Sequence, residues 1–169
     1  LQFRDKPLID YFIASAEKLI SECKRLKITF NDINANKSLH LTVENSSILE
    51  GNIENIEFLK KYGVKVATLT WNDSNCIGDG VLADKPKGAT AFGKQVINEY
   101  IKNNIAIDVS HTSDDLFYDI ASSNPKYILA THSNSREICS NKRNITDEQF
   151  EYNKKKNGVV GLNFHKYFL

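Results

Sequence analysis

Short apolar segments alternate with segments of helical spacing along most of the chain, and this alternation constrains the fold more than any other feature of the sequence. Apolar residues on one face predict a helix over residues 7–25. The buried strands that we predict are residues 38–43, 64–69, 105–109, 127–130 and 158–164. The helices that we predict between them are residues 53–62, 90–103, 113–121 and 148–156. The chain therefore has the pattern of successive β/α units.

Strict alternation of strand and helix favours a parallel sheet, because parallel strands need crossover connections and are covered on both faces. A doubly wound sheet would carry a glycine-rich phosphate loop after its first strand, and neither GxGxxG nor GxxxxGK[ST] occurs in this chain. A (β/α)8 TIM barrel needs eight units over about 250 residues. We therefore predict an α/β fold in which residues 1–169 form a single domain, a partial TIM barrel of about five units with parallel strands.

Charge and cysteine content narrow the class of protein. Twenty-two basic and 21 acidic residues leave a net charge of +1, so we expect no binding to nucleic acid or to an anionic membrane surface. No apolar run reaches the length of a membrane span, about 20 residues. The cysteines Cys23, Cys76 and Cys139 are odd in number and lack CxxC spacing, which argues against a disulfide framework or a zinc knuckle. We expect them to be reduced and buried.

The start of the chain resembles the middle of a fold. It begins at Leu1 and contains no methionine, so we expect a fragment or a processed product of a longer protein. An open part of a barrel would leave two strand edges unpaired and apolar surface exposed. We therefore expect the chain to form a homo-oligomer that covers these edges.

Three polar residues follow the ends of predicted strands. Glu44, His111 and His132 each lie at or just past the C-terminal end of a strand, the edge at which barrel enzymes gather their catalytic residues. A carboxylate and two imidazoles are ligands of zinc and related ions. On this pattern alone, each histidine could equally be a hydrogen-bonded structural residue. His40 lies inside a predicted strand, where we expect a core or face histidine, and His165 has no comparable context, so neither is assigned to a metal.

Several segments resemble the membrane (renal) dipeptidase family, peptidase family M19. Residues 107–111 read Ile-Asp-Val-Ser-His, residues 131–133 read Thr-His-Ser, and residues 143–147 read Arg-Asn-Ile-Thr-Asp. They resemble the family's ID(L/V)SH, (S/T)HS and RN(L/V/I)xD motifs in order and spacing, and weaker matches extend across most of the chain. The resemblance implies a (β/α)8 barrel that hydrolyses dipeptides with a metal-activated water at a centre of two zinc ions.

The resemblance also implies roles for individual residues. Glu44 matches the carboxylate that bridges the two zinc ions, and His111 and His132 match the imidazoles that complete the second metal. Arg143 matches the arginine that binds the C-terminal carboxylate of the dipeptide, which suits the planar fork of a guanidinium. Trp71 occupies a position where mammalian members have a substrate-contacting histidine; tryptophan resembles the bacterial branch, so we expect a substrate-binding residue in a bacterial, cytoplasmic protein.

Other parts of the family pattern are absent from the chain. The first metal of the family is held by a His-x-Asp pair, and no such pair occurs here. The carboxylate that assists proton transfer comes from the last barrel strand, which we expect beyond Leu169. Asn45-Ser46-Ser47 follows Glu44, where many members have a glycine-rich turn. We therefore predict no catalytic residue within this segment, and we expect the segment alone to be inactive.

Two alternative interpretations remain open at this point. The segment could be an inactive or truncated barrel remnant that acts as a metal-binding or non-enzymatic unit, and a His-x-Asp pair in the parent gene would argue against this. It could also belong to an unrelated amidohydrolase barrel, which would share histidines at strand ends. The spacing from Glu44 to Arg143 fits that second alternative less well.

Overall fold

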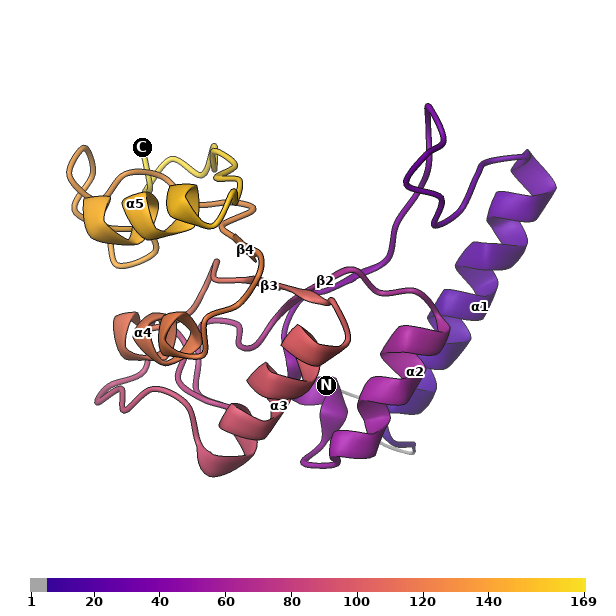
Figure 1. Cartoon of the computed structure of the whole chain (residues 1–169), viewed down its shortest axis with the longest axis horizontal. Helices are drawn as coiled ribbons and strands as arrows, with labels where there is room; N and C mark the ends of the chain where they lie inside the picture. Colours follow the sequence, from indigo (N-terminus) through magenta and orange to yellow (C-terminus); the bar gives the residue numbers. More distant parts are fainter. Residues whose placement is uncertain (1–5) are drawn as a thin grey trace.

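A parallel sheet of four strands forms the centre of the protein in the computed structural model, which describes residues 6–169 (Figure 1). The strands are β1 (Thr42–Val43), β2 (Val66–Thr68), β3 (Ala106–Asp108) and β4 (Ile128–Leu129). They lie in the sheet in chain order and every neighbouring pair is parallel. This is the arrangement of successive β/α units, as the alternation of the sequence predicts.

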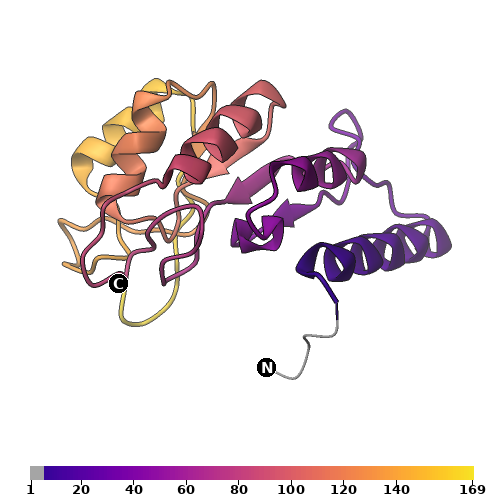
Figure 2. The ribbon, with the colours of Figure 1, turned by 90° about the horizontal axis from the view of Figure 1, so that it is seen from below.

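The helices lie alongside the sheet in chain order, from α1 at one end of the molecule to α5 at the other (Figure 2). The α-helices are α1 (Leu8–Leu26), α2 (Ile56–Lys61), α3 (Ala91–Lys102), α4 (Asp114–Ser122) and α5 (Asp147–Lys155). Short 3-10 helices, η1 (Ser46–Leu49) and η2 (Ile53–Asn55), precede α2. Hydroxyl side chains cap α3, α4 and α5, and Thr146 and Gln149 form a capping box at α5. These caps satisfy backbone N–H groups that the first turn of a helix leaves unpaired.

The core lies between the sheet and the helices. Ile107 of β3 and Ala67 of β2 are fully buried, together with apolar residues of α2, α3 and α4. Tyr100 of α3 is also fully buried, and its hydroxyl donates a 2.8 Å hydrogen bond to Ser46 Oγ. Ser46 Oγ in turn donates to the backbone oxygen of Thr68 at 2.6 Å. This chain of hydrogen bonds joins α3, the turn after β1 and the end of β2.

The prediction of a fifth strand over residues 158–164 is wrong. Residues 159–161 make backbone hydrogen bonds to Ala130 and Ser133, but only one parallel bridge forms there, between Ala130 and Val160. Beyond it the side chain of Asn134 takes the place of a strand partner: Asn163 N donates to Asn134 Oδ1 at 2.8 Å, and Asn134 Nδ2 donates to the backbone oxygen of Asn163 at 2.7 Å. A side-chain amide that bonds the backbone in this way competes with a regular ladder. The alternation therefore ends at four strands within residues 6–169.

Three smaller expectations also need correction. The first predicted strand is shorter than residues 38–43, because only Thr42 and Val43 pair with β2. His40 is exposed and lies outside the strands, where its Nδ1 contacts Asn31 Oδ1 at 3.2 Å. All three cysteines are free, as expected, but only Cys23 is buried; Cys76 is exposed and Cys139 is partly buried. Cys76 and Cys139 lie outside the apolar faces of the helices, so the residue type alone did not predict whether they are buried.

Among the described helices, none has the length and apolar character needed to cross a membrane.

Candidate metal centre

Glu44, His111 and His132 meet at the C-terminal edge of the sheet. Glu44 directly follows β1, and the two histidines lie three residues after the ends of β3 and β4. Glu44 Oε1 is 3.2 Å from His111 Nε2 and 3.5 Å from His132 Nε2, and the two Nε2 atoms are 2.9 Å apart. The predicted convergence of these three residues is confirmed.

Each imidazole is oriented by an oxygen atom on its far side. His111 Nδ1 is 2.9 Å from Asn72 Oδ1, and His132 Nδ1 is 2.8 Å from Thr131 Oγ1. The backbone N–H of His132 also donates to Ser110 Oγ at 3.1 Å. Because both Nδ1 atoms are engaged, both rings turn their Nε2 atoms toward Glu44.

The backbone at the site adopts conformations that residues other than glycine rarely take. His111 has a φ of 79° and Asn45, which follows Glu44, has a φ of 71°. A non-glycine residue held there costs about 1–3 kcal/mol, which surrounding contacts must offset. The N–H of Val81, in the loop after β2, donates to the backbone oxygen of His111 at 2.8 Å. Asn45 Oδ1 accepts from Ser47 N at 3.1 Å, so asparagine here adopts the turn that glycine would otherwise supply.

Burial and charge keep His111 neutral. Burial is the main cause that lowers the pKa of His111, to about 3, and the nearby charges of Arg143 and His132 lower it further. Burial also lowers the pKa of Arg143, while Asp108 and Glu44 act in the opposite direction. The guanidinium stays protonated in any case. At neutral pH the centre therefore contains a neutral imidazole, ready to act as a ligand, beside a fixed positive charge.

Arg143 and Trp71 flank the three central residues. Arg143 is buried, its Nη2 donates to the backbone oxygen of His132 at 3.3 Å, and its guanidinium lies 5.4 Å from the centre of the Phe168 ring. Within residues 6–169, no carboxylate forms an ion pair with it. Trp71 is 48% exposed, and its ring centre lies 5.9 Å from that of His111. Both residues therefore lie beside the cluster.

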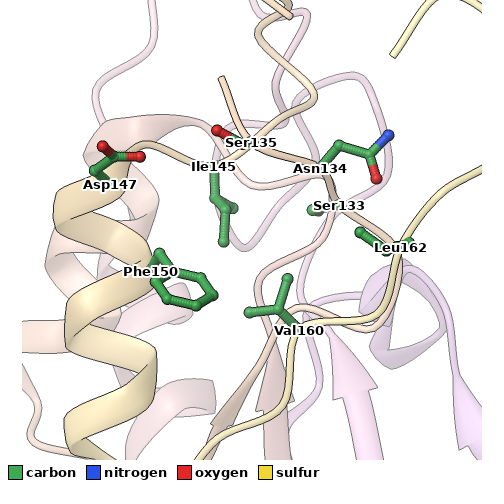
Figure 3. A pocket seen from close by; sticks show the side chains of 8 residues that line it. All are labelled: Ser133, Asn134, Ser135, Ile145, Asp147, Phe150, Val160 and Leu162. Carbon is green, nitrogen blue, oxygen red and sulfur yellow. The ribbon is translucent and has the colours of Figure 1, made fainter. Parts of the chain in front are cut away.

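A cavity of about 370 Å³ is lined by Glu44 and His132 of the cluster. Its walls come from β1, β2, the end of β3 and the segment after β4, and they include Asp108 and Thr131. This volume is at the lower end of the range for small-molecule sites. A second cavity, of about 270 Å³, lies between α5, residues 133–135 and residues 160–162 (Figure 3). It is apolar and contains no residue of the cluster, whereas Glu44 and His132 line the first cavity.

The three central residues fit a divalent metal ion. Ligand atoms lie about 2.0–2.2 Å from a tetrahedral zinc ion and therefore about 3.3 Å from one another. The three separations in the cluster are 2.9, 3.2 and 3.5 Å. One carboxylate oxygen and two imidazole nitrogens are a donor set that suits zinc.

No sequence pattern predicted a role for three further residues around the centre, namely Asn72, Asp108 and Thr131. Asn72 lies 39 residues from His111, and Asp108 lies 23 residues from Thr131. Their hydrogen bonds join loops that only the fold brings together. Asp108 and Thr131 stand beside the histidines in the motifs of residues 107–111 and 131–133, and this proximity is the signal that could have indicated a role for them.

Comparisons with known proteins identify the family. Residues 10–169 match the sequence model of the membrane dipeptidase family, peptidase family M19. The chain belongs to this family. Among membrane dipeptidase relatives, Dipeptidase 3 of Homo sapiens is 27% identical over 124 residues, which are 70% of this chain and 25% of that protein. An uncharacterized protein from Acinetobacter calcoaceticus is 30% identical over 167 residues, which are 91% of this chain and 53% of that protein.

A solved structure shares the fold. A metallopeptidase from Rhodobacter sphaeroides, determined with a phosphinate mimic of the dipeptide L-Ala-D-Ala, superposes with a TM-score of 0.73 at 26% identity. The match covers 78% of this chain and 39% of that one. The chain thus spans about half the length, or less, of the relatives that it matches.

Proposed function

We propose that this chain is part of a zinc-dependent dipeptidase, in which Glu44, His111 and His132 hold a zinc ion and Arg143 binds the substrate. The observation that carries the proposal is the convergence of one carboxylate oxygen and two Nε2 atoms within 3.5 Å of one another. Membership of the membrane dipeptidase family supports dipeptides as the substrate class. The dipeptide mimic bound by the Rhodobacter sphaeroides relative supports the same class.

A bound divalent ion would polarise the scissile carbonyl and lower the pKa of a water molecule, so that hydroxide forms near neutral pH. The protein's part is to supply and orient the ligands. The low pKa of His111 keeps its lone pair free of a proton at neutral pH. Glu44 adds negative charge, and its 56% exposed side chain can also reach a second ion. We propose that this second ion is the other zinc of a two-metal centre.

Arg143 suits the free carboxylate of a dipeptide. Its guanidinium is buried, is held against the backbone of His132 and has no acidic partner within residues 6–169. Arg136, in contrast, already forms a two-pronged ion pair with Asp114 at 2.7 and 2.9 Å. A buried cation without an acidic partner favours an anionic ligand, because its desolvation is then offset by a charged hydrogen bond. We propose that Trp71 packs against the same substrate at the rim.

The test is dipeptide hydrolysis by the product of the gene that encodes this chain, with zinc supplied. We expect release of free amino acids, and we expect Glu44→Gln to abolish it while the exposed Glu57→Gln leaves it unchanged. A protein that binds zinc at these residues but hydrolyses no dipeptide would favour the alternative function, a metal-binding or non-enzymatic unit. The absence of a His-x-Asp pair from the chain is the observation that keeps this alternative open.

A further inference from the structure

We propose that Asp108 is a positioning residue, which acts through the hydroxyl of Thr131 to fix the tautomer of His132. In this tautomer the proton is on Nδ1, so that Nε2 presents a lone pair to the metal ion. The inference rests on the proposed metal site, but it concerns a hydrogen-bond network that exists in the metal-free protein. Neither Asp108 nor Thr131 belongs to the ligand set.

The carboxylate of Asp108 is fully engaged as an acceptor. Asp108 is only 3% exposed. Its Oδ1 accepts from the backbone N–H of Ser110 at 2.9 Å and from that of Thr131 at 3.1 Å. Its Oδ2 forms a very short hydrogen bond with Thr131 Oγ1. An ionised carboxylate cannot donate, so the single hydroxyl proton of Thr131 must point at Asp108.

That direction decides the tautomer of His132. Thr131 Oγ1 has directed its proton to Asp108, so it can only accept from His132 Nδ1, 2.8 Å away. A neutral ring with its proton on Nδ1 makes this hydrogen bond and leaves the Nε2 lone pair facing His111 Nε2 and Glu44 Oε1, 2.9 and 3.5 Å away, where a metal ion would lie. Metal-binding histidines often have the other ring nitrogen held directly by a carboxylate. Here the carboxylate of Asp108 acts indirectly, through a hydrogen bond to the hydroxyl of Thr131.

The substitution Asp108→Asn should reverse this network. Two backbone N–H groups point at the Oδ1 position, so the amide oxygen of asparagine must occupy it. The amide NH₂ group then faces Thr131 Oγ1 and donates to it. The hydroxyl proton is free to turn toward His132 Nδ1, which becomes an acceptor. The ring proton therefore moves to Nε2, where it blocks the metal.

The tautomer can be read from the ring ¹⁵N chemical shifts of His132. The protein is treated with a chelator and kept at a pH where the ring is neutral. The signals of His132 are assigned by their loss in His132→Ala. We expect the Nδ1–H tautomer in the wild type and the Nε2–H tautomer in Asp108→Asn. Thr131→Ser keeps the hydroxyl and should keep the wild-type tautomer. Thr131→Val removes the hydroxyl without changing any charge and should give a mixture of tautomers.

Zinc affinity provides the second readout, measured by competition with a chelator of known affinity. We expect Asp108→Asn and Thr131→Val each to lower it by about 10- to 100-fold, while Thr131→Ser and the exposed control Asp115→Asn stay within about twofold. An unchanged Nδ1–H tautomer in both Asp108→Asn and Thr131→Val would overturn the inference, as would unchanged affinity in both. A wild type that shows the Nδ1–H tautomer but binds no zinc would contradict the proposed function and leave the network's role in the tautomer intact.

Discussion

His111 and His132 face each other with their Nε2 atoms 2.9 Å apart, while each ring holds an oxygen atom at Nδ1. Glu44 Oε1 lies within 3.5 Å of both atoms. A proton on one Nε2 atom can be shared with the other as a hydrogen bond, whereas a metal ion in its place can take the lone pairs of both. The fold therefore brings three electron-pair donors together at one point, which favours a cation there.

Acid should destabilise the metal-free protein through His111. Its pKa is about 3 in the folded state, against an ordinary value of 6.5. Between these values the unfolded chain binds more protons, so stability falls as pH falls from about 6.5 toward 3. Urea unfolding with a chelator present, at pH 7.5 and at pH 4.5, measures the loss. His111→Gln should lose less stability than the wild type over this interval, whereas the exposed control His40→Gln should match the wild type; equal losses in wild type and His111→Gln would contradict the assignment.

The buried hydrogen bonds of Tyr100 and Ser46 should have unequal energetic effects. Tyr100→Phe removes one hydrogen bond and leaves Ser46 Oγ bonded to Thr68, so we expect a loss of about 1 kcal/mol in the free energy of unfolding. Ser46→Ala leaves the buried Tyr100 hydroxyl without its acceptor, which costs about 1–3 kcal/mol. Urea unfolding compares the two, with the more exposed Tyr118→Phe as the control. A larger loss in Tyr100→Phe than in Ser46→Ala would contradict this account.

Arg143→Lys should raise the KM for dipeptides more than it lowers kcat. Lysine keeps the charge but loses the planar two-pronged geometry. Loss of one charged hydrogen bond costs about 1.5–3 kcal/mol, so we expect KM to rise by about 10- to 100-fold in steady-state kinetics. A dipeptide amide, which has no terminal carboxylate, is the matched substrate: the wild type and Arg143→Lys should handle it alike. If Arg143→Lys raised the KM of the dipeptide and of the dipeptide amide equally, Arg143 would not bind the carboxylate.

The isolated chain should associate with itself. Strands β1 and β4 are the edges of the sheet, and Leu162 and Phe164 beyond β4 are 70% and 84% exposed. Exposed edges and apolar side chains favour pairing between chains. Sedimentation velocity over a wide concentration range should show oligomers, and Leu162→Glu with Phe164→Glu should reduce them. A monomer at every concentration would rule this out.

The ends of the strands could be located from the sequence because short apolar segments alternate with segments of helical spacing. The positions of these strand ends placed Glu44, His111 and His132 at one edge of the sheet. The supporting residues could not be located in the same way. Asn72 reaches His111 by a hydrogen bond across 39 residues, and no local pattern encodes such a contact. The wrong fifth strand has a related cause, since the side chain of Asn134 bonds the backbone of Asn163 in place of a strand.

The most direct test of the proposed metal centre is the zinc content of the purified chain, measured by elemental analysis after zinc is supplied at neutral pH and the excess is removed. Wild-type protein, His111→Ala, His132→Ala and the control His40→Ala are compared. We expect about one zinc ion per chain in the wild type and in His40→Ala, and none in the other two variants. Absence of zinc from the wild type, or its retention in both cluster variants, would contradict the proposal that Glu44, His111 and His132 form a metal site.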